Sequence, residues 1–204
     1  MSLRSTRGRA LGALLIVLVG TMAVGCMPSG GMGNPGWTVV AAENGAVYAA
    51  MATGRVVALD AANPGEELWA YPQKSAESGG IGCSIAKPAG PAQDRPLDAV
   101  YGLPVLTDKL LILASYDRHL YAFEKDSGRI AWNSGEDAAT DAVIGGVTLY
   151  DGIAYFGSSD HRVYAWDIAT QALVWDTPFE TEDWVWGAPA VDEARVYVGS
   201  MDHR

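Results

Sequence analysis

The sequence predicts an all-β fold made of repeated four-stranded antiparallel units. Three observations support this prediction: sequence patterns recur every 42 or 43 residues, turn dipeptides separate short apolar runs, and aromatic residues recur at fixed positions. The chain contains 24 glycines, which suit turns, and 7 tryptophans and 9 tyrosines, which suit strands. A period of about 40–45 residues filled with short strands is typical of the blades of a β-propeller.

The repeats can be followed as matched segments. "LASYDRHLYAFEKDSGRIAW" ends at Trp132 and "FGSSDHRVYAWDIATQALVW" ends at Trp175, 43 residues later. The segment "GAPAVDEARVYVGSMDHR" is a further copy, which places Asp202 42 residues after Asp160. An earlier copy ends at Trp69, 63 residues before Trp132, so this interval contains an insertion.

One unit is predicted over residues 143–179. Asp151-Gly152 in this unit and Asn44-Gly45 in the first unit are strong hairpin signals between strand-like runs. The apolar runs "LLILA" and "AYFG" do not alternate with polar residues, which indicates strands covered on both faces. We expect the four strands of this unit at 145–150, 153–159, 163–168 and 172–177.

The first 25 residues are predicted to be a lipoprotein signal peptide. They contain three arginines, no acidic residue and a 14-residue apolar run, and small residues precede Cys26. The ending "AVGC" resembles the bacterial lipobox, which implies cleavage before Cys26 and lipidation of its thiol. The apolar run is short for a membrane-spanning helix, which needs about 20 residues, but an uncleaved N-terminal anchor is the alternative. Whether it is a cleaved signal peptide or an uncleaved anchor, this segment would export the rest of the chain.

Residues 26–36 are rich in Gly and Pro and are predicted to form a flexible tether. We expect the propeller to occupy 37–204, with a loop insertion at 73–98. Long loops are either functional or flexible, and the sequence leaves both open here. If Cys26 carries a lipid, Cys83 in this insertion has no intrachain disulfide partner.

The charge of the chain limits its partners. The net charge is −10, and it becomes −13 once residues 1–25 are removed with their three arginines. A surface this acidic argues against nucleic acid or an anionic membrane surface as the partner. It suits a solvated surface or a basic protein partner.

Two segments resemble the tryptophan-docking repeat of quinoprotein-like (PQQ-like repeat) propellers, whose pattern is Ala-x-Asp-x-x-Thr-Gly-x-x-x-Trp. They are "AFEKDSGRIAW" and "AWDIATQALVW", and "ALDAANPGEELW" matches with one inserted residue. The first departs at Glu124 and Ser127, and the second at Gln171. The resemblance spans roughly 37–204 and implies that each tryptophan packs on the neighbouring blade. The matching residues are Ala58, Asp60, Trp69, Ala122, Gly128, Trp132, Ala165, Asp167 and Trp175.

The family that these repeats resemble contains two kinds of protein. One is the dehydrogenases that bind pyrroloquinoline quinone and calcium; the other is cofactor-free binding proteins, including outer-membrane assembly lipoproteins of the BamB type. The sequence has no adjacent cysteine pair like that of the dehydrogenases, and no acidic loop typical of a calcium site. We therefore expect no cofactor and no enzymatic activity.

Asp, His and Arg recur in the turn between the second and third strands of three of the units. These residues are neighbours within single hairpins, whereas a catalytic triad converges from separate parts of a fold. One histidine per turn is not a metal cluster either. Blade topology places these turns on one face together with the links between units, so we expect a partner-binding face. The candidate residues are Asp117, Arg118, His119, Asp160, His161, Arg162, Asp202, His203 and Arg204.

The sequence thus predicts an exported, lipid-anchored propeller that binds proteins or acts as a scaffold in the cell envelope. It would lie on the outer side of the cytoplasmic membrane, in the periplasm or at the outer membrane, with an envelope protein as partner. Outer-membrane protein assembly is one specific version. The alternatives are a truncated quinone-dependent dehydrogenase and the extracellular sensor propeller of a signalling protein.

The predicted number of blades is about three and a half. Members of the family that the sequence resembles close a ring with seven or eight blades, which takes about 300–350 residues at the observed period. We therefore expect this sequence to be the N-terminal half of a longer protein, with closure by another chain as the alternative.

Overall fold

A computed structural model describes residues 39–63, 65–73, 95–135 and 138–202. Within these ranges the regular structure consists of β-strands, and no helix that could span a membrane is found. The predicted signal peptide, the tether, Cys26 and Cys83 lie outside the described residues, as do most of the 73–98 insertion, His203 and Arg204.

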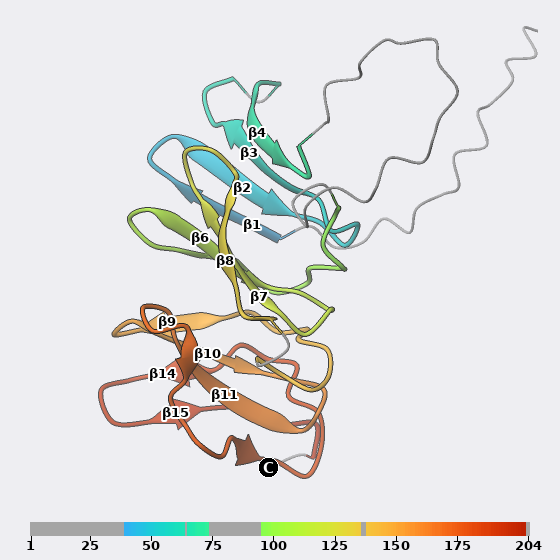
Figure 1. Cartoon of the computed structure of the whole chain (residues 1–204), viewed down its shortest axis with the longest axis vertical. Coiled ribbons are helices and arrows are strands. Elements are labelled where there is room, and N and C mark those ends of the chain that lie inside the picture. The colour runs from blue at the N-terminus through green and yellow to red at the C-terminus, as the bar shows by residue number, and fades with distance from the viewer. Residues whose placement is uncertain (1–38, 64, 74–94, 136–137, 203–204) are drawn as a thin grey trace, which may run out of the picture. The chain divides into compact units, whose positions relative to one another are not determined.

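Three antiparallel sheets follow one another along the chain, each a meander in which neighbouring strands are joined in sequence order (Figure 1). The first contains β1 (Val39–Glu43), β2 (Ala46–Ala50), β3 (Val56–Asp60) and β4 (Glu67–Tyr71). The second contains β5 (Val105–Leu106), β6 (Leu110–Ala114), β7 (Leu120–Glu124) and β8 (Ile130–Asn133). The third contains β9 (Thr148–Tyr150), β10 (Ile153–Gly157), β11 (Arg162–Asp167) and β12 (Ala172–Leu173), and β13 (Phe179–Glu180) also pairs with β11.

A further pair of strands, β14 (Ala190–Val191) and β15 (Val196–Tyr197), forms a two-stranded sheet. It corresponds to the first two strands of a fourth unit. The predicted all-β fold of four-stranded blades, about three and a half in number, is therefore confirmed.

The two predicted hairpin turns join the first and second strands of their sheets. Asn44 and Gly45 have φ values of 50° and 81°, and Asp151 and Gly152 have 47° and 77°. Positive φ at both central residues is the requirement of a type I′ turn. No atom lies within 4 Å of the place where a Cβ would stand on either glycine, so backbone conformation rather than crowding favours glycine here.

The fourth strand of the third sheet differs from the prediction of 172–177. It is split into β12 and β13, which pair with opposite ends of β11. The amide of Val174 still donates to the carbonyl of Ala165 at 2.8 Å, but the pairing then stops before Pro178, which has no amide hydrogen to donate. The same strand position is also irregular in the other two sheets, where the register shifts beside Ala58 and Ala122.

The first strand of the third sheet is also shorter than the predicted 145–150. The backbone at Gly145 approaches that of Trp186 and Gly187 closely, and Gly146 lies against Leu103. These residues therefore contact the neighbouring units, and pairing within the sheet begins at Thr148.

The hydrophobic cores lie between consecutive sheets. One cluster joins residues of the first and second sheets, and a second cluster joins residues of the second and third. Strand β6 contributes to both, since Leu113 belongs to the first cluster and Ala114 to the second. Its residues from Leu111 onward are buried without alternation, as the apolar run "LLILA" predicted for a strand covered on both faces.

Candidate binding face

Trp69 of β4 packs onto the second sheet. Its side chain is only 8% exposed, and its Nε1 donates to the carbonyl of Lys125 at 2.6 Å. The indole stacks against Phe123 with 6.4 Å between ring centroids. A Cβ on Gly128 would stand 2.4 Å from an indole carbon, and Gly128 has a φ of +67°. Glycine at this position therefore permits both the turn and the close approach of the ring.

Gln171 occupies the corresponding position in the third sheet, where the sequence departs from the family pattern. Its φ is 55°, and its amide donates to the carbonyl of Asp167 at 2.9 Å. The amide of Gly128 makes the equivalent 2.9 Å bond to Glu124. The turn is thus the same in both sheets, although a left-handed conformation is unfavourable for a residue with a Cβ.

Asp60 and Asp167 organise the turns that follow the third strands. The amides two and three residues later donate to Asp60 at 2.7 and 3.2 Å and to Asp167 at 2.8 and 2.9 Å. These hydrogen bonds hold the pKa of both carboxyls below the usual value. In the second sheet the longer Glu124 accepts instead from the hydroxyl of Ser127 at 2.6 Å. These two residues replace the Asp and Thr of the family pattern, and their hydrogen bond accounts for the joint replacement.

The repeat alanines lie beside the repeat tryptophans. Ala58 is paired with Trp69 and Ala122 with Trp132, while Ala165 accepts the amide of Val174 next to Trp175. A small side chain here leaves room for the indole on the same face of the sheet. All three alanines are fully buried: Ala58, Ala122 and Ala165.

The other two repeat tryptophans are less covered than Trp69. Trp132 is half-buried and packs against the core between the second and third sheets. Trp175 is also half-buried, with its ring 5.9 Å from that of Tyr155. The repeat therefore places equivalent tryptophans in three different environments.

The turns between second and third strands lie against the links that enter each first strand. The carbonyls of Ala99, Ala142 and Trp184 each accept an amide from the turn 17 residues later, at 2.8–2.9 Å. Because this contact recurs in three units, turns and links form one surface, which we call the turn-and-link face. It comprises the links 97–102, 141–145 and 183–187 and the turns 51–54, 115–118, 158–161 and 200–202.

The turn aspartates hold this face together. Asp160 accepts the amide and hydroxyl of Thr140 at 2.9 and 2.8 Å and the hydroxyl of Tyr164 at 2.6 Å. Asp202 accepts the amide of Glu182 at 3.1 Å. Asp117 accepts from Tyr121 at 2.8 Å. Their carboxylates are therefore engaged in joining the turn to the link or to the third strand.

Burial keeps the tyrosines of these bonds in their neutral, donating form. It raises the pKa of Tyr164 to about 12, and the hydrogen bond to Asp160 adds to the effect. The pKa of Tyr121 is raised in the same way, by burial and by its bond to Asp117. Both hydroxyls therefore act as structural donors at neutral pH.

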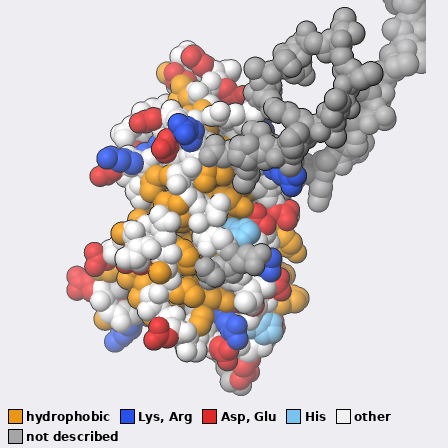
Figure 2. All heavy atoms as spheres, in the orientation of Figure 1, with side chains coloured by type: hydrophobic (Ala, Val, Ile, Leu, Met, Phe, Trp, Pro, Cys, Tyr) orange, Lys and Arg blue, Asp and Glu red, His pale blue; other side chains and the backbone are white. Residues whose placement is uncertain are grey.

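The histidines and arginines of the two fully described triplets, at 117–119 and 160–162, do not converge on one point. His119 lies beside Asp117, with its Nδ1 3.4 Å from a carboxylate oxygen. The carbonyl of His161 accepts from Thr181, whereas Arg162 pairs with Glu180 at 2.8 Å. Positive φ at Arg118 and His161 (78° and 67°) marks them as turn residues. Figure 2 shows the histidine side chains along one side of the described structure, among acidic and basic groups.

Two serines of these turns, Ser158 and Ser200, are also structural. Ser158 is fully buried, and its hydroxyl donates to the carbonyl of Asp141 at 2.9 Å. The hydroxyl of Ser200 donates to the carbonyl of Asp183 at 3.1 Å. Among the residues that the structure describes, no group of three or more His, Cys, Asp or Glu side chains could hold a metal ion.

Exposed aromatic residues line the turn-and-link face, and the residues predicted from the sequence did not include them. Tyr101 and Tyr116 lie edge to face with 6.3 Å between ring centroids, and they are 39% and 47% exposed. Trp184 and Trp186 are stacked at 4.9 Å with an interplanar angle of 7°, and they are 43% and 39% exposed. Trp186 is held in place because its Nε1 donates to the hydroxyl of Ser159 at 3.1 Å.

A repeated signal in the links could have located these residues. "DAVYG", "DAVIG" and "DWVWG" begin at Asp98, Asp141 and Asp183. The central valine of each copy is buried, and the residues around it are the ones that include the exposed rings. In the first and third copies the neighbours of this buried anchor include the exposed Tyr101, Trp184 and Trp186, which present aromatic groups on the face. The three anchors are Val100, Val143 and Val185.

The charge of the face is acidic. Within its defined segments there are six aspartates and one arginine, Arg118. Exposed tryptophan and tyrosine are typical of protein-binding surfaces, and they attract cationic side chains to their ring faces. The combination of aromatic rings and carboxylates is complementary to a partner segment that carries Lys or Arg.

Fold and face together define a β-propeller module with an aromatic, acidic surface. The family model described as outer membrane protein assembly factor BamB matches residues 21–149 and 138–204. The chain belongs to this family. A comparison with curated protein sequences gives no match.

Solved structures share the fold at low sequence identity. The computationally designed Ika4 protein has a TM-score of 0.61 at 15% identity, over 85% of this chain and 91% of its own. BamB from Moraxella catarrhalis has 0.54 at 17%, over 81% of this chain and 43% of its own. The WD40 propeller domain of Doa1 has 0.58 at 16%, over 81% and 47%. The chain thus spans less than half the length of the last two.

Proposed function

We propose that this chain is a protein-binding module of the cell envelope that engages its partner through the turn-and-link face. The single observation that carries the proposal is the set of exposed aromatic rings on that face, two of them stacked and anchored by a hydrogen bond from Trp186. Large rings held in fixed positions are the groups that contribute most to protein–protein affinity.

Membership of the BamB family supports a location in the cell envelope. The matching family is described by an outer-membrane assembly factor, and assembly of outer-membrane proteins is the specific version of the function that this description favours. The acidic charge of the face suits a partner segment with exposed Lys or Arg, which charge complementarity would orient during association.

Anchoring through Cys26 is the second part of the proposal. Residues 1–25 have the composition of a secretory signal peptide, and "AVGC" resembles the lipobox, with Ala23 where Leu is commoner. Cells that express the chain with a fatty-acid analogue are expected to label it, and Cys26→Ala is expected to abolish the label. Undiminished labelling of the variant would exclude Cys26 as the lipid site.

Site-specific photo-crosslinking in cells tests the binding face. A crosslinking amino acid is placed at Tyr116 or Trp184 on the turn-and-link face, both of which are exposed. Matched control positions are Asp126 and Ala169, exposed residues of the turns at the other end of the third strands. We expect the same envelope protein to be crosslinked from both positions on the face and from neither control.

The crosslinks also test the role of the rings. Trp186→Ala removes one ring of the stacked pair but leaves Tyr116 in place, so it is expected to reduce the crosslink from position 116 at least fivefold, as for a loss of about 1 kcal/mol or more at a binding hot spot. Equal crosslinking from face and control positions would contradict the proposal.

A further inference from the structure

The stacked pair Trp184–Trp186 presents flat aromatic faces to solvent. Its indoles are parallel to within 7°, and they are 43% and 39% exposed. The turn of the third unit holds the pair in place. Trp186 donates its Nε1 hydrogen to the hydroxyl of Ser159, and the amide of Val185 donates to the carbonyl of the preceding Ser158 at 3.2 Å. The rings therefore form a preorganised platform, and little ordering is needed when a partner binds.

The exposure of this platform is a property of the link and not of the fourth unit. Tyr101 occupies the position of Trp186 two units earlier. The backbone of its link contacts Met51 of the first unit and Gly145 of the third, so that this link has neighbours on both sides. Tyr101 is nevertheless 39% exposed, as Trp186 is. The link itself thus turns this side chain outward.

An aspartate begins the same link and places a carboxylate beside the platform. One oxygen of Asp183 accepts the amide of Trp184 at 2.7 Å, which holds the carboxylate against the backbone that carries the first indole. Among the residues that the structure describes, its other oxygen has no hydrogen-bond partner. Asp183 is half-buried, so solvent screens its charge less than that of a fully exposed aspartate.

An aromatic face next to a carboxylate is complementary to a cation, and the flat platform favours one cation in particular. Guanidinium is planar, stacks on aromatic rings and donates two parallel hydrogen bonds to a carboxylate, whereas an ammonium is a compact, strongly hydrated charge. A third planar group extends a stack of two parallel indoles. The chain's own Arg162, next to the turn of the third unit, is engaged with Glu180 at 2.8 Å.

We propose that the turn-and-link face recognises an arginine of its partner, whose guanidinium stacks on the Trp184–Trp186 pair and donates to Asp183. This assignment rests on the proposed function, which gives the face a protein partner, and it specifies the side chain that the partner presents. The preceding link begins with Asp141 but carries Ala142 and Ile144 where the tryptophans stand. It lacks the platform, and we expect it not to bind arginine.

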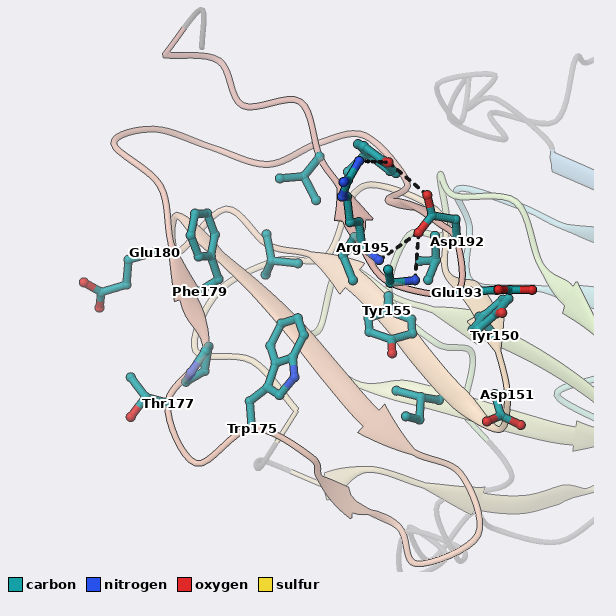
Figure 3. A pocket seen from close by; sticks show the side chains of 18 residues that line it. Tyr150, Asp151, Tyr155, Trp175, Thr177, Phe179, Glu180, Asp192, Glu193 and Arg195 are labelled. Carbon is teal, nitrogen blue, oxygen red and sulfur yellow. Dashed lines mark hydrogen bonds between the residues drawn. The ribbon is translucent and has the colours of Figure 1, made fainter.

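The groove between the third sheet and the β14–β15 pair provides an internal comparison (Figure 3). It is lined by Trp175 and Tyr155, whose rings are tilted by 56° and so form no flat platform. Two of the carboxylates that line it are already engaged. Asp192 accepts two amides of its own turn and the hydroxyl of Tyr197, and Glu180 is paired and points away from Trp175 in Figure 3. We therefore expect no guanidinium to stack on Trp175.

The test titrates the 204-residue chain, carrying ¹⁵N-labelled tryptophan, with three capped tripeptides: Gly-Arg-Gly, Gly-Lys-Gly and Gly-citrulline-Gly. Lysine keeps the charge but not the planar group, and citrulline keeps the planar group but not the charge. Trp→Phe variants assign the indole signals. We expect the arginine peptide to shift the Trp184 and Trp186 signals with a dissociation constant at least about threefold lower than that of either other peptide, as for a cation–π contact at an exposed site. The Trp175 signal is expected to stay unchanged.

Asp183→Asn keeps the acceptor for the Trp184 amide but removes the charge, so we expect it to weaken binding of the arginine peptide at least about threefold. The matched control is Asp141→Asn, because Asp141 accepts the amide of Ala142 at the same 2.7 Å. We expect this variant to change the affinity less than about twofold, since solvent screens a distant surface charge. Absence of binding, equal affinity for the arginine and lysine peptides, an equal response of Trp175, or equal binding by the two variants would overturn the proposal.

In-cell crosslinking separates this assignment from the proposed function. We expect Asp183→Asn to reduce the crosslink from position 116 at least about threefold relative to Asp141→Asn. A face-specific crosslink that Asp183→Asn leaves unchanged would overturn the arginine site and leave the proposed function intact. Arginine-specific peptide binding without a face-specific crosslink would support the site and contradict the proposed function.

Discussion

Trp69→Ala is expected to lower the free energy of unfolding by about 3–5 kcal/mol, the usual cost of truncating a buried tryptophan. The substitution removes an indole that is covered by Phe123 and the turn at Gly128, and it leaves the carbonyl of Lys125 without its donor. The cavity would lie between the first and second sheets. Urea denaturation followed by circular dichroism measures the change.

Two further variants show whether docking causes this loss. Trp69→Phe keeps an aromatic ring but removes the Nε1 donor, so we expect a loss of about 1–2 kcal/mol. Trp175→Ala changes the same repeat position in the third sheet, where no sheet covers the ring in the described structure. We therefore expect its free energy of unfolding to fall by only about 1 kcal/mol. Equal losses for Trp69→Ala and Trp175→Ala would show that docking on the next sheet does not stabilise the chain.

Gly102→Ala is expected to destabilise the chain by about 3 kcal/mol, at the upper end of the range for overpacking. A Cβ on Gly102 would stand 2.2 Å from the carbonyl oxygen of Gly145. Because the contact is with backbone of the neighbouring unit, no side chain can move to make room. The two units would have to separate, and this would disturb the core clusters between the sheets.

The control for this substitution is Gly187→Ala, at the same link position one unit after Gly145. No atom lies within 4 Å of the place of its Cβ. We expect a change of less than about 0.5 kcal/mol, as for an ordinary surface substitution. The thermal unfolding midpoints of both variants give the comparison, and a Gly102→Ala chain as stable as Gly187→Ala would refute the close backbone approach between units.

The sequence was sufficient to predict the features that local chemistry determines. Asn44-Gly45 and Asp151-Gly152 specify tight turns through their backbone preferences, and they adopt the positive φ values that such turns need. The period of 42 or 43 residues was sufficient to predict the four-stranded units, because each unit carries its own strand and turn signals. The unbroken apolar run in β6 likewise indicated burial on both faces.

Features that depend on neighbouring units could not be predicted from periodicity alone. Two of the turn aspartates, Asp160 and Asp202, accept hydrogen bonds from Thr140 and Glu182, which lie 20 residues earlier in sequence. The different exposure of Trp69 and Trp175 depends on what covers each sheet, which the shared repeat pattern does not encode. The aromatic pair Trp184–Trp186 lies in a link outside the repeat pattern that aligns the strands, so that pattern did not predict its exposure.

The central claim is that the turn-and-link face is the surface that binds an envelope protein. The most direct measurement is the in-cell crosslinking yield from position 184 compared with that from position 126, at the other end of the strands. We predict a single crosslinked envelope protein from position 184, reduced at least fivefold with Trp186→Ala, and none from position 126. The same crosslinked protein at equal yield from position 126, or none from position 184, would contradict the account.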